Sequence, residues 1–351
     1  MEQFRINCFE LCSAGRICDV KKASDYFLSL QSRPSEALQL SYSMLQRRDE
    51  NVDVWLLASQ ILVSAASKSV DTAVMEAVCN LASSRCAWKR YAPVRSQVCL
   101  AVAYVIPGSS NARELIASVG RQLKRDSDFF IEVLGLIPEV ILKHRTPVSD
   151  DLHAAVAEIL EANFERVKKE MTASSANQQH SLSCLAQILQ SVMAWLELAE
   201  GNSTLSSQWV GIAIVRWSFD VLGQPQWLHH FLSAEGDESH VKFYWKALEL
   251  LSSVCQSLDR IPRNDEIGHG GSVAMAMAYS EQCLSLIAHI LSVVASSGAQ
   301  LRSGDEEGGT LQSLLIMLCS CSSGLLSTAM GSGHDDSTIS TIFTYLSLIH
   351  I

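Results

Sequence analysis

The sequence lacks the excess of positive charge that a nucleic-acid-binding protein needs. Its 27 Lys and Arg residues are outnumbered by 37 Asp and Glu residues, which gives a formal net charge of −10. Binding to a phosphate backbone depends on clustered basic side chains, so we expect no direct contact with nucleic acid. An acidic surface favours basic partners, or basic segments of partners, instead.

Proline and glycine are also scarce, with 7 and 18 residues in a chain of 351. So few turn formers argue against an all-β sandwich, and long stretches rich in Ala, Leu, Ser and Gln favour helices. The chain is longer than one compact core usually supports. We therefore predict an all-α protein that is either two domains or an elongated helical repeat structure.

Motifs for common catalytic and cofactor sites are missing. The sequence has no GxxxxGK[ST] phosphate-binding loop, no HExxH zinc helix and no GxSxG nucleophile elbow. The stretch GHGGS at 268–272 is similar to the oxyanion loop of some esterases, but without a nucleophile elbow we interpret it as a flexible loop. We expect no enzyme activity, no catalytic residue and no cofactor.

Cysteine and histidine residues do not have the spacing of a metal site. Cys319 and Cys321 form a CxC pair, but in an apolar helix their thiols point to different faces. A zinc site would also need a second Cys/His pair at the right spacing. His229, His230 and His240 form a loose group that we interpret as solvated loop histidines. No metal site is expected.

The eleven cysteines indicate a reducing compartment, because no secretory signal peptide precedes them. The N-terminal segment carries Glu2 and Arg5 rather than a basic segment followed by an apolar core. Five cysteines have apolar neighbours, as buried free thiols usually do: Cys79, Cys99, Cys184, Cys255 and Cys283. The expected location is the cytosol or the nucleus.

Two uncharged stretches, 282–301 and 308–334, have the length of a membrane span. Serines and a histidine interrupt the first, and glycines and serines interrupt the second. Neither is a continuous apolar run of the roughly 20 residues that a spanning helix requires. We expect no membrane insertion.

Helical segments separated by short breaks run along the whole chain. Three breaks predict helix ends: Pro107-Gly108, Gly223 with Pro225, and Ile261-Pro262-Arg263-Asn264. Asn111 and Glu114 predict a capping box, and 264–271 and 299–310 are predicted loops. The predicted helices are 22–31, 34–47, 51–67, 71–87, 94–106, 111–124, 128–142, 149–170, 178–199, 205–222, 239–259, 272–297 and 309–328.

The stretch DFFIEVLGLIPEVIL at 128–142 has helical periodicity and an unusually apolar surface. Most of its circumference is hydrocarbon, which predicts packing against neighbours on two sides. Pro138 is expected to end or kink the helix. Four residues spaced by four, three and four form its one narrow polar stripe: Asp128, Glu132, Gly135 and Glu139.

Five stretches, in order along residues 23–200, carry a family resemblance. The first is ASDYFLSLQSRPSEALQLSYSMLQ at 23–46, and the third is VRSQVCLAVAYVI at 94–106. The second, VWLLASQIL at 54–62, has four residues at motif positions: Trp55, Ala58, Gln60 and Leu62.

The fourth stretch is similar to an LxxLPEE motif through Leu134, Leu136, Pro138 and Glu139, with Val140 in place of the second acid. The fifth, SVMAWLEL at 191–198, contains Trp195. In their order and spacing the five stretches resemble the N-terminal region of importin-beta-type nuclear transport receptors (karyopherins). The transportin-SR and importin-thirteen branch fits best.

The resemblance implies a right-handed superhelical α-solenoid of HEAT-type antiparallel helix pairs. Residues 1–200 would be N-terminal importin-beta-like repeats, and 201–345 would continue the same solenoid. Such receptors shuttle between nucleus and cytoplasm and carry protein cargo through nuclear pores under the control of the small GTPase Ran. The implied partners are Ran in its GTP form, protein cargo and nuclear pore proteins.

In this family the N-terminal repeats bind Ran-GTP largely through inner helices, which implicates the helices at 51–67 and 94–106. The resemblance assigns no individual contact to Ran or cargo, because the motif residues are mostly packing residues. For Gln60 we expect a hydrogen bond between helices rather than a contact with a partner.

Two other function classes remain open. One is a helical-repeat scaffold without Ran dependence, such as a vesicle-coat or kinase-regulatory subunit. The other is a helical enzyme or hydrolase that uses a cysteine nucleophile. A cysteine of that kind would react faster than the buried thiols.

The last six residues, LSLIHI at 346–351, resemble a translated transposon-type sequencing adapter. Importin-type receptors are also much longer than this chain. We therefore expect a fragment whose natural sequence ends near Tyr345, followed by a non-native tail.

Overall fold

All regular secondary structure in the described part of the chain is helical, which confirms the predicted all-α class. The computed structural model divides into two compact units, Met1–Val156 and Ala157–Ile351. The division expected at residue 200 marks the end of the family resemblance and stays a prediction. The described residues are 2–12, 17–48, 50–68, 78–82, 84, 87–107, 109, 111–123, 127–146, 148–173, 178–200, 202–232, 237–260, 270–296, 313–322 and 325.

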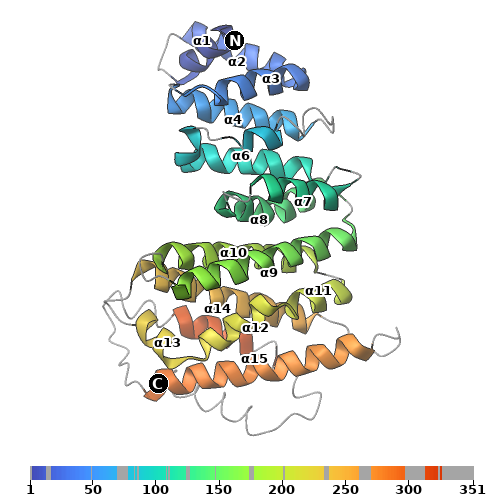
Figure 1. Ribbon diagram of the computed structural model, residues 1–351, viewed down its shortest axis with the longest axis vertical. Coiled ribbons are helices and arrows are strands. Elements are labelled where there is room, and N and C mark those ends of the chain that lie inside the picture. Colours follow the sequence, from blue (N-terminus) through green and yellow to red (C-terminus); the bar gives the residue numbers. More distant parts are fainter. Residues whose placement is uncertain are drawn as a thin grey trace. The chain divides into compact units, whose positions relative to one another are not determined.

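The first unit is a series of helices that follow one another in chain order (Figure 1). Most of the described helices are joined by short segments, which keep neighbours in the sequence close in space. The helices are α1 (Glu2–Cys12), α2 (Ile17–Gln31), α3 (Pro34–Leu45), α4 (Val52–Ala66), the 3-10 helix η1 (Ala87–Arg90), α6 (Ala92–Val105), α7 (Ala112–Gln122), α8 (Ser127–His144) and the beginning of α9 (Asp150–Ala173).

Helices α4, α6 and α8 pack side by side and run parallel. Trp55 near the start of α4 contacts Tyr91 just before α6, with 5.7 Å between ring centroids. At the other end, Tyr104 of α6 contacts His144 of α8, with 5.2 Å between ring centroids. Parallel neighbours require a return segment between them, and α7 occupies that place between α6 and α8.

The starts of these helices follow from local chemistry. Pro34 opens α3 and Pro93 lies in the first turn of α6, where proline removes no helical hydrogen bond and already has a helical φ. The Asn51 side chain accepts a hydrogen bond from the backbone N–H of Asp53 and thereby caps α4. Asn111 stands at the start of α7, but its side chain forms no cap, so the predicted capping box with Glu114 is wrong.

Helix α8 has the polar stripe that its sequence predicts. Asp128, Glu132 and Gly135 are half-buried and Glu139 is exposed, whereas the residues on its other sides are almost all buried. Of the two effects predicted for Pro138, the end of the helix is wrong, because α8 continues to His144, and the kink stays a prediction. Burial of the flanking apolar residues offsets the roughly 3 kcal/mol that an interior proline costs.

The second unit is arranged around α14, which packs against α10, α12, α13 and α15. Its helices are the rest of α9, α10 (Gln178–Leu198), α11 (Ser203–Val210), α12 (Ala213–Leu222), α13 (Pro225–Leu232), α14 (Glu238–Asp259), α15 (Gly270–Ser296) and a further helix at Ser313–Ser322. Trp195 of α10 stacks on Trp209 of α11 in the core, with 5.7 Å between ring centroids.

Helices α10 and α14 also run parallel, like α4, α6 and α8. Gln178 at the start of α10 lies 3.4 Å from His240 at the start of α14, measured between the Nε2 atoms. Just beyond the other ends, Glu200 forms an ion pair with Arg260. Three helices, α11 to α13, lie between α10 and α14 in the sequence.

Helix boundaries agree with the sequence-based predictions in most places and differ in a few. The predicted helix 205–222 is broken at Gly211-Ile212 into α11 and α12, while α1 and α13 were not predicted. Of the predicted loop 264–271, the last two residues belong to α15. The stop at 261–264, the loop at 299–310 and the tail at 346–351 lie outside the described residues.

Two helices are long and apolar enough to cross a membrane by length and composition: Gln178–Leu198 and the segment Met277–Val294 of α15. Two-thirds of the first is buried within the protein, as in the central helix of a packed core. The expected absence of membrane insertion stays a prediction.

Candidate functional site

The residues at family-motif positions occupy three helices, α4, α8 and α10. Six of the eight are buried: Trp55, Ala58 and Leu62 on α4, Leu134 and Pro138 on α8, and Trp195 on α10. The other two, Gln60 and Glu139, are exposed. The buried six hold helices together, so only the exposed two could contact a partner directly.

Within the part of the chain that the structure describes, Gln60 does not make the hydrogen bond between helices that the sequence predicted. Its side chain lies on the exposed side of α4 and has no hydrogen-bond partner within the described ranges. The position was expected to pack between helices because the other motif residues do, whereas the side chain of Gln60 is exposed. An exposed, unpaired amide can donate to and accept from a partner.

Glu132 connects α8 to α6 in the same layer. Its Oε2 accepts from Arg95 Nε at 2.9 Å, and its Oε1 accepts from Ser96 Oγ at 2.6 Å. Both charged side chains are partly exposed. This pairing fixes the register of two parallel helices, so the polar stripe of α8 is partly structural.

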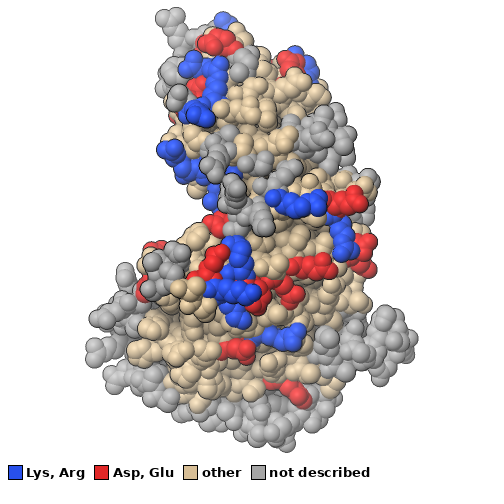
Figure 2. All heavy atoms as spheres, viewed as in Figure 1, with Lys and Arg blue, Asp and Glu red and all other residues tan. Residues whose placement is uncertain are grey.

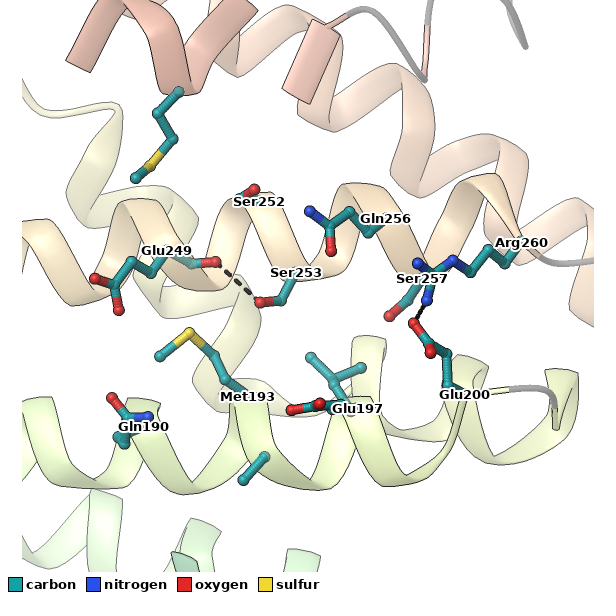
Figure 3. A pocket seen from close by; sticks show the side chains of 13 residues that line it. Gln190, Met193, Glu197, Glu200, Glu249, Ser252, Ser253, Gln256, Ser257 and Arg260 are labelled. Carbon is teal, nitrogen blue, oxygen red and sulfur yellow. Dashed lines mark hydrogen bonds and ion pairs between the residues drawn. The ribbon is translucent and has the colours of Figure 1, made fainter. Parts of the chain in front are cut away.

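The second unit contains a groove between α10 and α14 with a volume of about 540 Å³, within the range of small-ligand sites. Figure 3 shows the two helices forming its sides, with Met193 reaching from α10 toward α14. Met317 of the helix Ser313–Ser322 also lines it. Sequence reasoning missed this groove because three helices, α11 to α13, separate its two sides in the chain.

Ion pairs occur at both ends of the groove. Glu200 pairs with Arg260 at one end, and at the other Glu249 accepts from Lys246 Nζ at 2.6 Å. Glu197 lies between them on α10, on the side that faces α14 (Figure 3). Among the described residues no Lys, Arg or His pairs with its carboxylate, so the middle of the groove carries an uncompensated negative charge.

Several uncharged polar groups in the groove also lack partners. Gln190 of α10 and Gln256 of α14 are exposed amides with no hydrogen bond to any described residue. Ser257 is only 7% exposed, and its hydroxyl likewise has no protein partner in the described part of the chain. In Figure 3 this hydroxyl points into the space between α14 and α10.

Several of the described cysteines lack the properties of a nucleophile. The five cysteines predicted to be buried free thiols are all buried, and none of them forms a disulfide. Burial raises the pKa of the Cys79 thiol to about 11, and the pKa of Cys319 is raised by its burial as well. A nucleophilic cysteine requires a lowered pKa, so these thiols give the enzyme hypothesis no support.

Three thiols meet in the core of the second unit: Cys255 of α14, Cys283 of α15 and Cys321. The hydrogen bond with Cys283 raises the pKa of Cys255, whereas the one with Cys321 lowers it in part. The hydrogen bond with Cys255 raises the pKa of Cys321. Cys319 is only half-buried, as expected if it and Cys321 lie on different faces of their helix.

The three histidines are on helices rather than in a loop. His229 and His230 belong to α13 and are exposed, and His240 belongs to α14. The Nδ1 atom of His240 lies 3.4 Å from an oxygen of Asp237. The predicted loop placement is therefore wrong.

The face in Figure 2 carries basic and acidic side chains on both units, and no broad basic patch is visible among its coloured residues. No protein-family model matches the chain, and no curated protein is significantly similar to it. A functional proposal must therefore depend on the motif stretches and the geometry of the helices.

Proposed function

We propose that this chain is the N-terminal part of a nuclear transport receptor of the importin-beta type, which binds Ran-GTP and protein cargo. One observation carries the proposal. Four of the motif stretches fall on α4, α6, α8 and α10, and the first three of these helices are parallel neighbours in one layer. The stretches at 54–62, 94–106 and 134–139 thus lie on three helices that are successive neighbours in this layer.

The parallel layer fits a HEAT-type solenoid, in which each helix pair contacts only its neighbours and one helix of every pair contributes to the same face. Under this proposal α4 and α6 present the Ran-binding face. Gln60 on α4 belongs to that face because it is exposed and has no partner among the described residues. A right-handed superhelix of such pairs would shuttle between nucleus and cytoplasm and contact nuclear pore proteins.

Binding of purified Ran to the immobilised 351-residue chain tests the proposal. We expect Ran loaded with a non-hydrolysable GTP analogue to bind at least about tenfold more tightly than Ran-GDP, a difference of about 1.4 kcal/mol. Equal binding of both forms, or binding of neither by a folded chain, would contradict the proposal and favour a Ran-independent scaffold.

A matched pair of variants places the Ran site. Gln60→Arg puts a larger charged side chain on the exposed face of α4, and we expect it to weaken Ran-GTP binding. Gln226→Arg makes the same change at an exposed position of α13 and should leave binding unchanged. Circular dichroism of both variants verifies that each is folded.

A further inference from the structure

We infer that the groove between α10 and α14 binds an extended peptide segment that carries an arginine or lysine side chain. The described residues that line the groove include three glutamates but only one cation, Arg260. Arg260 is already paired with Glu200, and Glu249 is paired with Lys246. A basic side chain of a ligand would therefore neutralise Glu197, the carboxylate left without a cation among the described residues.

The uncharged groups fit the main chain of such a segment. Gln190 and Gln256 lie on opposite sides of the groove, and each amide can donate to a peptide C=O and accept from a peptide N–H. Ser257 is more than nine-tenths buried as a residue, and its hydroxyl has no hydrogen bond to another described residue and points into the groove. A ligand group in the groove can therefore donate to this hydroxyl or accept from it.

The groove also has apolar surface for the stem of a long basic side chain. Met193 and Met317 line it from two different helices. Methionine side chains are flexible and polarizable, and they adapt to ligands of varied shape. Lysine and arginine place their methylene groups on apolar surface while the charged end reaches a carboxylate. In this groove the two methionines would contact the methylene groups of the ligand side chain, and Glu197 would bind its charged end.

This inference does not depend on Ran binding, because every residue it uses belongs to the second unit. The probe is a fluorescein-labelled nine-residue peptide of repeating Gly and Ser with two central arginines. Two further peptides of the same length have alanine or glutamate in place of arginine. Fluorescence anisotropy with the 351-residue chain measures the affinity of each peptide.

We expect the arginine peptide to bind more tightly than the alanine peptide, and the glutamate peptide not to bind. Glu197→Gln should weaken binding of the arginine peptide by at least about tenfold, because one charged hydrogen bond is lost, and should leave binding of the alanine peptide unchanged. Gln190→Ala should weaken binding of both the arginine and the alanine peptide, because it removes a contact with the main chain of the peptide. Glu238→Gln, at an exposed position of α14 outside the groove, is the matched control.

Two results would overturn the inference. If Glu197→Gln and Glu238→Gln weaken the arginine peptide equally, binding reflects the general acidity of the chain rather than this groove. If the glutamate peptide binds best, Arg260 rather than Glu197 determines the ligand. Both results are independent of whether the chain binds Ran-GTP.

Discussion

A single missing side chain sets how closely α7 and α8 approach. A Cβ atom added to Gly120 of α7 would lie 2.9 Å from Cε1 of Phe130 on α8. The Phe130 ring is buried and has little room to move. The sequence could not predict this role, because Gly120 sits within an ordinary helical pattern and its neighbour is known only from the packing.

We predict that Gly120→Ala destabilises the protein by about 1–3 kcal/mol, the usual cost of overpacking a core. Gly135→Ala is the control, since Gly135 lies on the half-exposed stripe of α8 and alanine there improves helix propensity by about 0.5–1 kcal/mol. Urea unfolding followed by circular dichroism compares the two variants. Equal stability of both would mean that the close approach is not tight.

A buried histidine should make stability dependent on pH. Burial lowers the pKa of His153 on α9, and Asp150 opposes this effect in part. The folded state therefore favours the neutral ring, while the unfolded chain takes up a proton near the ordinary pKa of about 6.5. Above that pH the two states bind equally few protons at this site; below it, protonation stabilises the unfolded chain.

We predict that the thermal midpoint falls as the pH is lowered from about 7.5 to about 5.5, and falls less in His153→Gln. His144→Gln changes an exposed histidine and should keep the pH dependence of the wild type. Differential scanning calorimetry at several pH values measures the slopes. The same slope in all three proteins would show that His153 does not contribute.

At the scale of elements, α8 illustrates how far sequence reasoning reaches. Its polar stripe and its buried remainder follow from periodicity, because Asp128, Glu132 and Glu139 recur at helical spacing. The continuation through Pro138 does not, because it depends on neighbours that bury the helix on several sides. The break at Gly211-Ile212 was missed for a similar reason: Glu161 of α9 accepts from the Ala213 N–H at 2.7 Å and caps α12 from a distance.

Leucines on the two sides of α8 should differ in their contribution to stability. Leu134 is fully buried and Leu142 is 50% exposed. We predict that Leu134→Ala lowers the free energy of unfolding by about 2–5 kcal/mol, as truncations of buried leucines do. Leu142→Ala should lower it by less than about 1 kcal/mol. Denaturant unfolding that gives under about 1 kcal/mol for Leu134→Ala would mean that this side of α8 is not core.

The pairing between α6 and α8 should be measurable as a coupling energy. A double-mutant cycle with Glu132→Gln and Arg95→Gln isolates their interaction. Because both side chains are partly exposed, we predict a coupling of about 0.5–1 kcal/mol that decreases at high salt. A coupling near zero would mean that solvent screens the pair completely.

At the scale of the whole molecule, the same packing relation appears within each unit. Parallel helices pack side by side although other segments separate them in the sequence: α4, α6 and α8 in the first unit, and α10 and α14 in the second. Composition predicted an all-helical chain but not which helices would be parallel neighbours. The groove can be found only when α10 and α14 are known to be neighbours, because Glu197 and Gln256 belong to these two different helices.

The central claim is that α4 and α6 form a face that binds Ran in its GTP form. Hydrogen–deuterium exchange of the 351-residue chain, alone, with Ran-GTP and with Ran-GDP, tests it most directly. We predict slower exchange in peptides covering Val52–Ala66 and Ala92–Val105 with Ran-GTP only. Exchange in these two helices that is unchanged by Ran-GTP, or changed equally by Ran-GDP, would contradict the account.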